Sequence, residues 1–174
     1  MDILVTRWIG LSATVRLVSE KREPLRTRFP ESFLRMADSL SQWIPADTMK
    51  ETELARKYGE YVYELGNGGI FAGLWRSAEM LGCGIHADLR SIPIRQETVE
   101  FCEFFDLNPY RLESFGAALI FAHDGSKMLE ILEESGIPAV RIGRTTDGND
   151  RILRNEDRVM YLTKPQPDEI KKII

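Results

Sequence analysis

The chain has 174 residues, of which 43% are hydrophobic and 29% are charged, and its formal net charge is −4 at pH 7. These values are ordinary for one globular domain with a sizeable core, and the acidic balance argues against bulk binding to nucleic acid or to an anionic membrane. No apolar run approaches the roughly 18 residues that a membrane span requires, and the N-terminus lacks the layout of a secretory signal.

Apolar residues recur alternately at strand spacing and at helical spacing, and glycine, proline and capping residues mark the boundaries. In chain order, the expected elements are strand 2–8, helix 11–20, helix 30–44, helix 47–58 ended by Gly59, strand 61–65, helix 67–81, strand 84–89, helix 96–105, strand 117–122, a helix that stops at Gly136, strands 139–144, 151–153 and 159–162, and a short helix after Pro167. Because strands and helices alternate without repeats, the sequence predicts one α/β domain over residues 1–174 with a mixed sheet.

Two segments rich in basic residues have a solvated interpretation and an anion-binding alternative. Segment 16–28 holds five Lys or Arg residues against two glutamates, which favours a solvated face over an anion-binding patch. The sequence Thr-Thr-Asp-Gly-Asn-Asp at 145–150 predicts a hairpin turn, since it lacks the ligand spacing of a calcium loop. The arginines that flank this turn are typical of a solvated sheet edge, and the alternative is a surface that receives phosphate: Arg141, Arg144, Arg151, Arg154 and Arg158.

The cysteines and histidines do not form a catalytic or metal-binding pattern. Cys83 and Cys102 lie in apolar stretches without a Cys-x-x-Cys motif, so we expect buried free thiols in a reducing compartment, which indicates the cytoplasm. His86 is expected at a strand surface or interface. His123 follows a strand, and Asp124 beside it is interpreted as a helix N-cap. The large aromatic residues are expected in the core or in a dimer contact: Trp8, Trp43, Trp75, Phe101, Phe104 and Phe105.

The most informative segment is the passage from strand 61–65 through glycines into helix 67–81. Gly66, Asn67, Gly68 and Gly69 form the turn, which would aim free backbone N–H groups at one point and suit an anion. The alternative is a tight turn required only for close backbone packing. Glu64 is interpreted either as a vestigial metal or substrate ligand or as a residue that caps the turn or pairs with an arginine. No Lys-Ser/Thr follows the glycines and no carboxylate cluster flanks them, so the pattern predicts binding rather than catalysis and no metal site.

Six short motifs occur in an order that resembles a known family. They are Leu-Val-Thr-Arg-Trp-Ile-Gly at 4–10, Glu-Leu-Gly-Asn-Gly-Gly at 64–69, Ile-Pro at 92–93, Phe-Asp-Leu-Asn-Pro at 105–109, Ser-Phe-Gly-Ala at 114–117 and Ala-Val-Arg-Ile-Gly at 139–143. Together they resemble the C-terminal domain of the aminoimidazole ribonucleotide synthase (PurM-like) superfamily, and within it the hydrogenase-maturation branch. The resemblance implies a three-layer α/β/α arrangement with a mixed sheet. It also implies an N-terminal partner domain, absent from this sequence, that carries most ATP contacts and forms the dimer.

The sequence departs from the family at the glycine turn. The family commonly has Asp-x-Thr/Ser-x-Gly-Gly there, whereas Glu64 stands at the position of the acid and Gly66 at that of the hydroxyl residue. The chain ends in Ile-Ile and not in the reactive cysteine of the hydrogenase-maturation branch, so thiocarbamoylation of its terminus is not expected.

Three functional hypotheses follow from the resemblance and its departures. The first is a stand-alone C-terminal domain, non-catalytic by itself, that binds a small phosphorylated ligand or a partner protein. The second is the substrate-side half of an ATP-dependent enzyme that a separate N-terminal domain completes in trans. The third is a homodimeric structural module. We expect no cofactor in the isolated domain, with ATP and magnesium bound only if an N-terminal partner domain exists.

Overall fold

The computed structural model describes residues 1–58 and 60–174, and its strands form one seven-stranded sheet. The strands are β1 (Asp2–Thr6), β2 (Tyr61–Glu64), β3 (Gly84–Asp88), β4 (Ala118–Ala122), β5 (Ala139–Thr146), β6 (Arg151–Asn155) and β7 (Arg158–Tyr161). The helices are α1 (Leu11–Glu20), α2 (Arg22–Arg26), α3 (Glu31–Ser39), α4 (Met49–Lys57), α5 (Gly69–Leu81), α6 (Gln96–Phe105) and α7 (Gly125–Glu134), with short 3-10 helices η1 (Leu40–Trp43), η2 (Leu89–Ser91), η3 (Pro109–Arg111) and η4 (Glu169–Lys172). The helix end expected at Gly59 lies outside the described residues.

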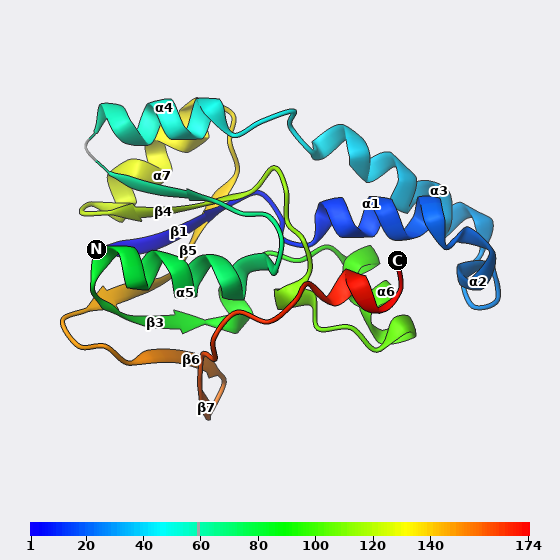
Figure 1. The fold of residues 1–174 in the computed structure, drawn as a ribbon. Helices are drawn as coiled ribbons and strands as arrows, with labels where there is room; N and C mark the ends of the chain where they lie inside the picture. Colours follow the sequence, from blue (N-terminus) through cyan, green and yellow to red (C-terminus); the bar gives the residue numbers. More distant parts are fainter. Residues whose placement is uncertain (59) are drawn as a thin grey trace.

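The sheet is mixed, as predicted. Its strand order is β2-β4-β1-β5-β3-β6-β7, and every neighbouring pair is antiparallel except β3 and β6, which run parallel. Two helical layers enclose part of this sheet: α5 lies over one face, and α4 and α7 lie over the other (Figure 1). The three-layer α/β/α arrangement expected from the resemblance is therefore confirmed.

Alternation along β1 separates the two cores. Ile3 packs with α5 on one side of the sheet, whereas Leu4 packs with α4 and α7 on the other. Both side chains are fully buried, because successive side chains of a strand point to opposite faces and helices cover both faces here. A strand that is covered on both faces has a continuous run of apolar residues in its sequence. β4 is a second example, since all five of its residues are buried.

A third core lies beyond the end of the sheet, where α1 and α3 extend to the right in Figure 1. Leu17 of α1, Leu34 of α3 and Phe101 of α6 are fully buried in it, and Ile170 of η4 joins them. The C-terminal segment is thereby anchored against α1 and α6, which brings it beside the start of α5 (Figure 1).

The prediction of a hairpin turn at residues 145–150 is wrong. β5 continues to Thr146, and β3 lies between β5 and β6, with Ile85 paired to Thr145 on one side and to Arg151 on the other. The connecting segment wraps the start of β3, where the Ile85 N–H donates to the Asp150 carbonyl at 2.8 Å. A local turn signal specifies that the chain reverses, but it does not specify which strand pairs with which. The tight hairpin instead joins β6 and β7.

Several other expectations can be compared with the structure directly. The bounds of α1 and α6 agree with the predicted helices, and Phe101 is fully buried as expected. Trp43, in contrast, is 54% exposed, so it is not a core residue. Cys83 is half-buried and Cys102 is buried, both as free thiols, and burial raises the pKa of Cys102 to about 12. Among the described residues, none of the helices has the length and apolarity needed to cross a membrane.

Candidate functional site

The glycine turn joins a strand to a helix, as the sequence predicts. β2 ends at Glu64, and α5 begins at Gly69 after Gly68, which adopts a left-handed conformation with φ 82°. Gly69 also has a positive φ of 61°. A β-carbon there would stand 2.5 Å from the carbonyl oxygen of Leu112 and 2.6 Å from that of Tyr110. The glycines therefore serve a close backbone approach, which is the packing role weighed from the sequence.

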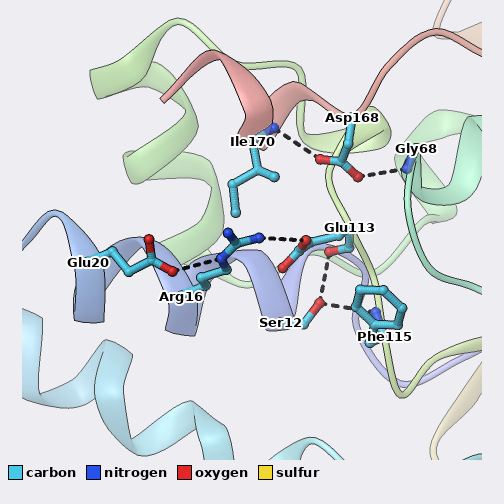
Figure 2. Close-up of polar contacts among 8 residues, drawn as sticks. All are labelled: Ser12, Arg16, Glu20, Gly68, Glu113, Phe115, Asp168 and Ile170. Atoms are coloured by element: carbon cyan, nitrogen blue, oxygen red, sulfur yellow. Dashed lines mark hydrogen bonds and ion pairs between the residues drawn. The ribbon is translucent and has the colours of Figure 1, made fainter. Parts of the chain in front are cut away.

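The start of α5 also binds an anion, and that anion is a side chain of the same molecule. The Gly68 N–H donates to Oδ2 of Asp168 at 2.7 Å, and Oδ1 of the same carboxylate accepts from the Ile170 N–H at 3.0 Å (Figure 2). Asp168 is only 4% exposed. A buried carboxylate at a helix N-terminus compensates the unpaired N–H groups and the positive end of the helix dipole. One of the backbone donors that a phosphate would use is therefore already engaged.

A second buried acid lies between this site and α1. Glu113 is 6% exposed, and its Oε2 accepts from Nη1 of Arg16 at 3.3 Å (Figure 2). Burial raises the pKa of Glu113, and the charge of Asp168 acts in the same direction, while Arg16 opposes both. Arg16 also donates to Glu20 at 2.8 Å. The charged groups at this site thus form ion pairs and hydrogen bonds with one another and do not leave an open, positively charged pocket.

The basic segment 16–28 is largely neutralised by ion pairs. Arg22 contacts Glu31 and Asp38 at 2.6 Å each, and Arg26 contacts Glu31 at 3.1 Å. These side chains are exposed or half-buried, so the segment is a solvated, paired surface, as the sequence pattern favours.

The remaining predicted site residues do not converge on Gly68. Glu64 is exposed, and its Oε1 accepts from Oγ1 of Thr52 in α4 at 3.4 Å. Asn67 is also exposed. Gly66 lies under the ring of Phe115, since a β-carbon there would stand 3.0 Å from that ring. The turn therefore brings together Gly66, Gly68 and Gly69 but leaves Glu64 and Asn67 at its surface.

The histidines occupy separate places. His86 is half-buried on β3. His123 is exposed, and its Nδ1 lies 3.0 Å from Oε2 of Glu60. The expected N-cap is confirmed, because Oδ1 of Asp124 accepts from the Lys127 N–H at 3.0 Å at the start of α7. Within residues 1–58 and 60–174, no three His, Cys, Asp or Glu side chains are grouped so as to hold a metal ion.

Sequence reasoning missed the two residues that define the site. Asp168 comes 100 residues after Gly68, and its only local signal is its position as N-cap of η4. Phe115 belongs to the Ser-Phe-Gly-Ala motif, which gives no sign that its ring covers Gly66 or that it is 48% exposed. Both contacts depend on how distant segments meet, which no local pattern reveals.

The comparisons with known proteins agree with this architecture. A family model described as AIR synthase related protein, C-terminal domain, matches residues 62–167. None of the curated proteins compared with the chain matches it. Among solved structures, the hydrogenase maturation protein HypE of E. coli has a TM-score of 0.75 and 17% identity, over 96% of this chain and 50% of that chain.

Two further solved structures share the fold. HypE in a HypE–HypF complex has a TM-score of 0.68 and 18% identity, over 94% of this chain and 52% of that chain. Thiamine-monophosphate kinase of Stenotrophomonas maltophilia K279a has a TM-score of 0.64 and 20% identity, over 89% of this chain and 49% of that chain. The chain thus spans about half the length of the structures it matches, and at these identities the likeness shows the fold alone.

Proposed function

The chain belongs to the family of AIR synthase related proteins, as a C-terminal domain of that family, and on this premise we propose that it binds a partner protein and does not hydrolyse ATP by itself. The partner that fits the premise is an ATP-binding domain of the same family. ATP and magnesium would then bind through that partner, and this chain would supply the substrate side or a regulatory surface.

One observation carries the choice of a partner over a small ligand at the glycine turn. The Gly68 N–H is engaged by the buried carboxylate of Asp168 at 2.7 Å. A phosphate would have to displace this carboxylate and leave it buried beside Glu113, which is unfavourable for two negative charges. The hydrogen bond between Gly68 and Asp168 thus rigidifies the turn. The accessible surface beside it is its outer rim, by which we mean the exposed side chains of Phe115 and Trp43.

That rim is aromatic. Phe115, over Gly66, is 48% exposed, and Trp43 is 54% exposed. The two residues belong to segments that meet at Gly116, where a β-carbon would stand 2.8 Å from Pro45. Exposed aromatic side chains on segments that meet are typical of protein interfaces, because they bury a large apolar area with few rotatable bonds. One of the solved structures of the same fold, HypE, forms a complex with HypF, which supports a partner-binding role for such a domain.

The catalytic half of the proposal is tested by an ATPase assay. The purified chain with ATP and magnesium is expected to release no phosphate above a blank without protein, because the described residues provide no carboxylate cluster for the metal. Turnover that co-purifies with the chain and that Glu64→Ala abolishes would contradict the proposal.

The partner is tested by sedimentation velocity with the ATP-binding domains of this family that the same genome encodes. We expect one of them to form a complex with the chain, and we expect Trp43→Ser and Phe115→Ser to weaken it. Met80→Ser is the matched control, since Met80 is 71% exposed on α5 away from the rim. Self-association of the chain that the rim variants abolish would instead favour the homodimeric module. A complex that Met80→Ser weakens equally would remove the assignment to the rim.

A small phosphorylated ligand at Glu64 and residues 66–69 is the second candidate. It is favoured by the observation that the Gly68 N–H binds an oxyanion at all, in the form of Asp168. In this case Asp168 competes with the ligand, and its removal is expected to create phosphate affinity.

A further inference from the structure

A β-bulge places two arginines of β5 on the same face of the sheet. In the pairing with β1, Arg144 lies opposite Asp2 and Gly143 opposite Ile3, but Arg141 lies opposite Leu4, so the register shifts by one residue. In a regular strand, residues three apart point to opposite faces. Because β5 has one extra residue between these pairs, Arg141 and Arg144 point to the same face of the sheet.

The bulge is fixed by the neighbouring strand. A β-carbon at Gly143 would stand 2.1 Å from the carbonyl oxygen of His86 on β3, so only glycine allows the two backbones to approach this closely. His86 is paired with Arg144, and Asp88 is paired with Arg154 of β6, so these four side chains share one face of the sheet, the face to which the bulge turns Arg141. The arginines are therefore held on paired strands and not on a mobile loop.

The helices leave this part of the sheet open. The core beneath α4 and α7 takes strand residues from β1, β2, β4 and only Ala139 at the start of β5. Further along the sheet the same face carries a pocket of about 440 Å³. Its polar lining consists of Asp2, His86, Asp88, Arg141, Arg144 and Arg154.

The carboxylates of the pocket form hydrogen bonds or ion pairs, whereas two of its arginines form no ion pair with a described residue. Oδ2 of Asp2 accepts from the Gly125 N–H at 3.2 Å and lies 3.7 Å from Nη1 of Arg141. Asp88 accepts from the Arg90 N–H at 3.0 Å. Among the ion pairs between described residues, none involves Arg144 or Arg154. Both residues are exposed and line the pocket, and neither has a carboxylate of the described residues within ion-pair distance.

We propose that this pocket binds a small phosphate monoester, with Arg144 and Arg154 as its principal donors. Guanidinium groups form paired hydrogen bonds with phosphate oxygens, and two of them on neighbouring registers can hold one dianionic group. Arg141, which is oriented by Ser126 at 2.9 Å, adds positive potential beside them. The site is separate from the glycine turn, because α5 covers the opposite face of the sheet.

Isothermal titration calorimetry of the full chain with inorganic phosphate and with glycerol 3-phosphate tests this assignment. At about 0.15 M salt, where exposed charges are screened beyond about 8 Å, we expect saturable binding. Arg144→Met and Arg154→Met keep the apolar stem but remove the donors, and each is expected to weaken the affinity about tenfold or more. Arg158→Met, with the same change of charge on the adjacent β7, is expected to leave binding unchanged. Circular dichroism melting verifies that every variant is folded.

The two probes distinguish a free phosphate site from a monoester site: tighter binding of glycerol 3-phosphate supports the monoester. Absence of saturable binding of both probes would overturn the proposal. So would an equal loss in Arg158→Met, because it would show that net charge and not the pocket governs binding. Binding of a polyglutamate peptide in place of either phosphate compound would assign the face to an acidic polypeptide and would also refute the proposal. None of these readouts involves ATP turnover or the aromatic rim, so the outcome is independent of the partner-binding function.

Discussion

The start of α5 and the bulged face of β5 both present groups that attract an anion, but they differ in what already engages those groups. At the start of α5 the donor is a backbone N–H, and the buried carboxylate of Asp168 occupies it at 2.7 Å. On β5 the donors are exposed guanidinium groups, and those of Arg144 have no ion-pair partner among the described residues. A group of anion-binding donors therefore indicates a ligand site only where no side chain of the same chain already engages those donors.

The largest effect is expected for Gly69→Ala, which tests the packing of the filled site. The alanine would combine a left-handed φ of 61° with a β-carbon 2.5 Å from the Leu112 carbonyl oxygen. Conformational strain and overpacking together predict a loss of about 2–5 kcal/mol in the free energy of unfolding, measured by urea denaturation. Gly82→Ala is the matched control, because Gly82 has the same φ but no atom within 4 Å of its β-carbon position. It should lose only about 1–2 kcal/mol, and equal losses would show that packing against Leu112 is unimportant.

Asp168→Ala tests the difference between the two sites most directly, because it removes the carboxylate that engages the start of α5. The variant leaves the Gly68 N–H without its carboxylate, which predicts a loss of about 2–3 kcal/mol in the free energy of unfolding. It should also allow inorganic phosphate to shift the Gly68 amide signal in an NMR titration, which the wild type should not show. Asp124→Ala removes an exposed N-cap instead and should cost about 1 kcal/mol without this shift. A wild-type Gly68 signal that moves with phosphate would contradict the filled-site interpretation.

Gly143→Ala tests the second of the two sites, the arginine pocket on β5. Its β-carbon would stand 2.1 Å from the His86 carbonyl oxygen, so β5 must move away from β3, which displaces Arg144 from Arg154 and disturbs the bulge that holds Arg141 beside it. We expect a loss of about 1–3 kcal/mol in the free energy of unfolding, together with the loss of phosphate binding to the pocket. Gly148→Ala has room for its β-carbon and should change stability by less than about 0.5 kcal/mol. Retention of phosphate affinity in Gly143→Ala would separate the site from the bulge.

The smallest effect concerns the pH dependence of the filled site. Burial raises the pKa of Glu113 above the ordinary value of 4.5, and Asp168 adds to this shift. Because the folded state holds this proton more tightly than the unfolded state, the associated stability is present below pH 4.5 and is lost as the pH rises through the folded-state pKa. Glu113→Gln stays neutral, so it should gain stability relative to the wild type above pH 4.5, as measured by urea denaturation at a series of pH values. A difference that is constant with pH, or one that the exposed Glu20→Gln reproduces, would argue against this origin.

The residues themselves show why the fold was predictable and the site only in part. Helix 96–105 and helix 11–20 follow from apolar spacing and from local boundary residues, and the structure places them there. The glycine turn at 66–69 was also recognisable, because a strand, glycines and a helix start are consecutive in the sequence. The hairpin expected at 145–150 failed, since β3 inserts between β5 and β6, and pairing with a strand 60 residues earlier in the chain leaves no local trace.

The sequence by itself determined the alternation of elements, the α/β class, the family resemblance and the succession of strand, glycine turn and helix at the start of α5. These properties depend on spacing within one segment, where side-chain periodicity and backbone preference act over a few residues. Only the tertiary structure decided that Asp168 engages the start of α5 and that a bulge brings Arg141 and Arg144 to one face. Both outcomes arise when segments distant in the chain pack together, because burial and strand register depend on neighbours that the local sequence does not specify.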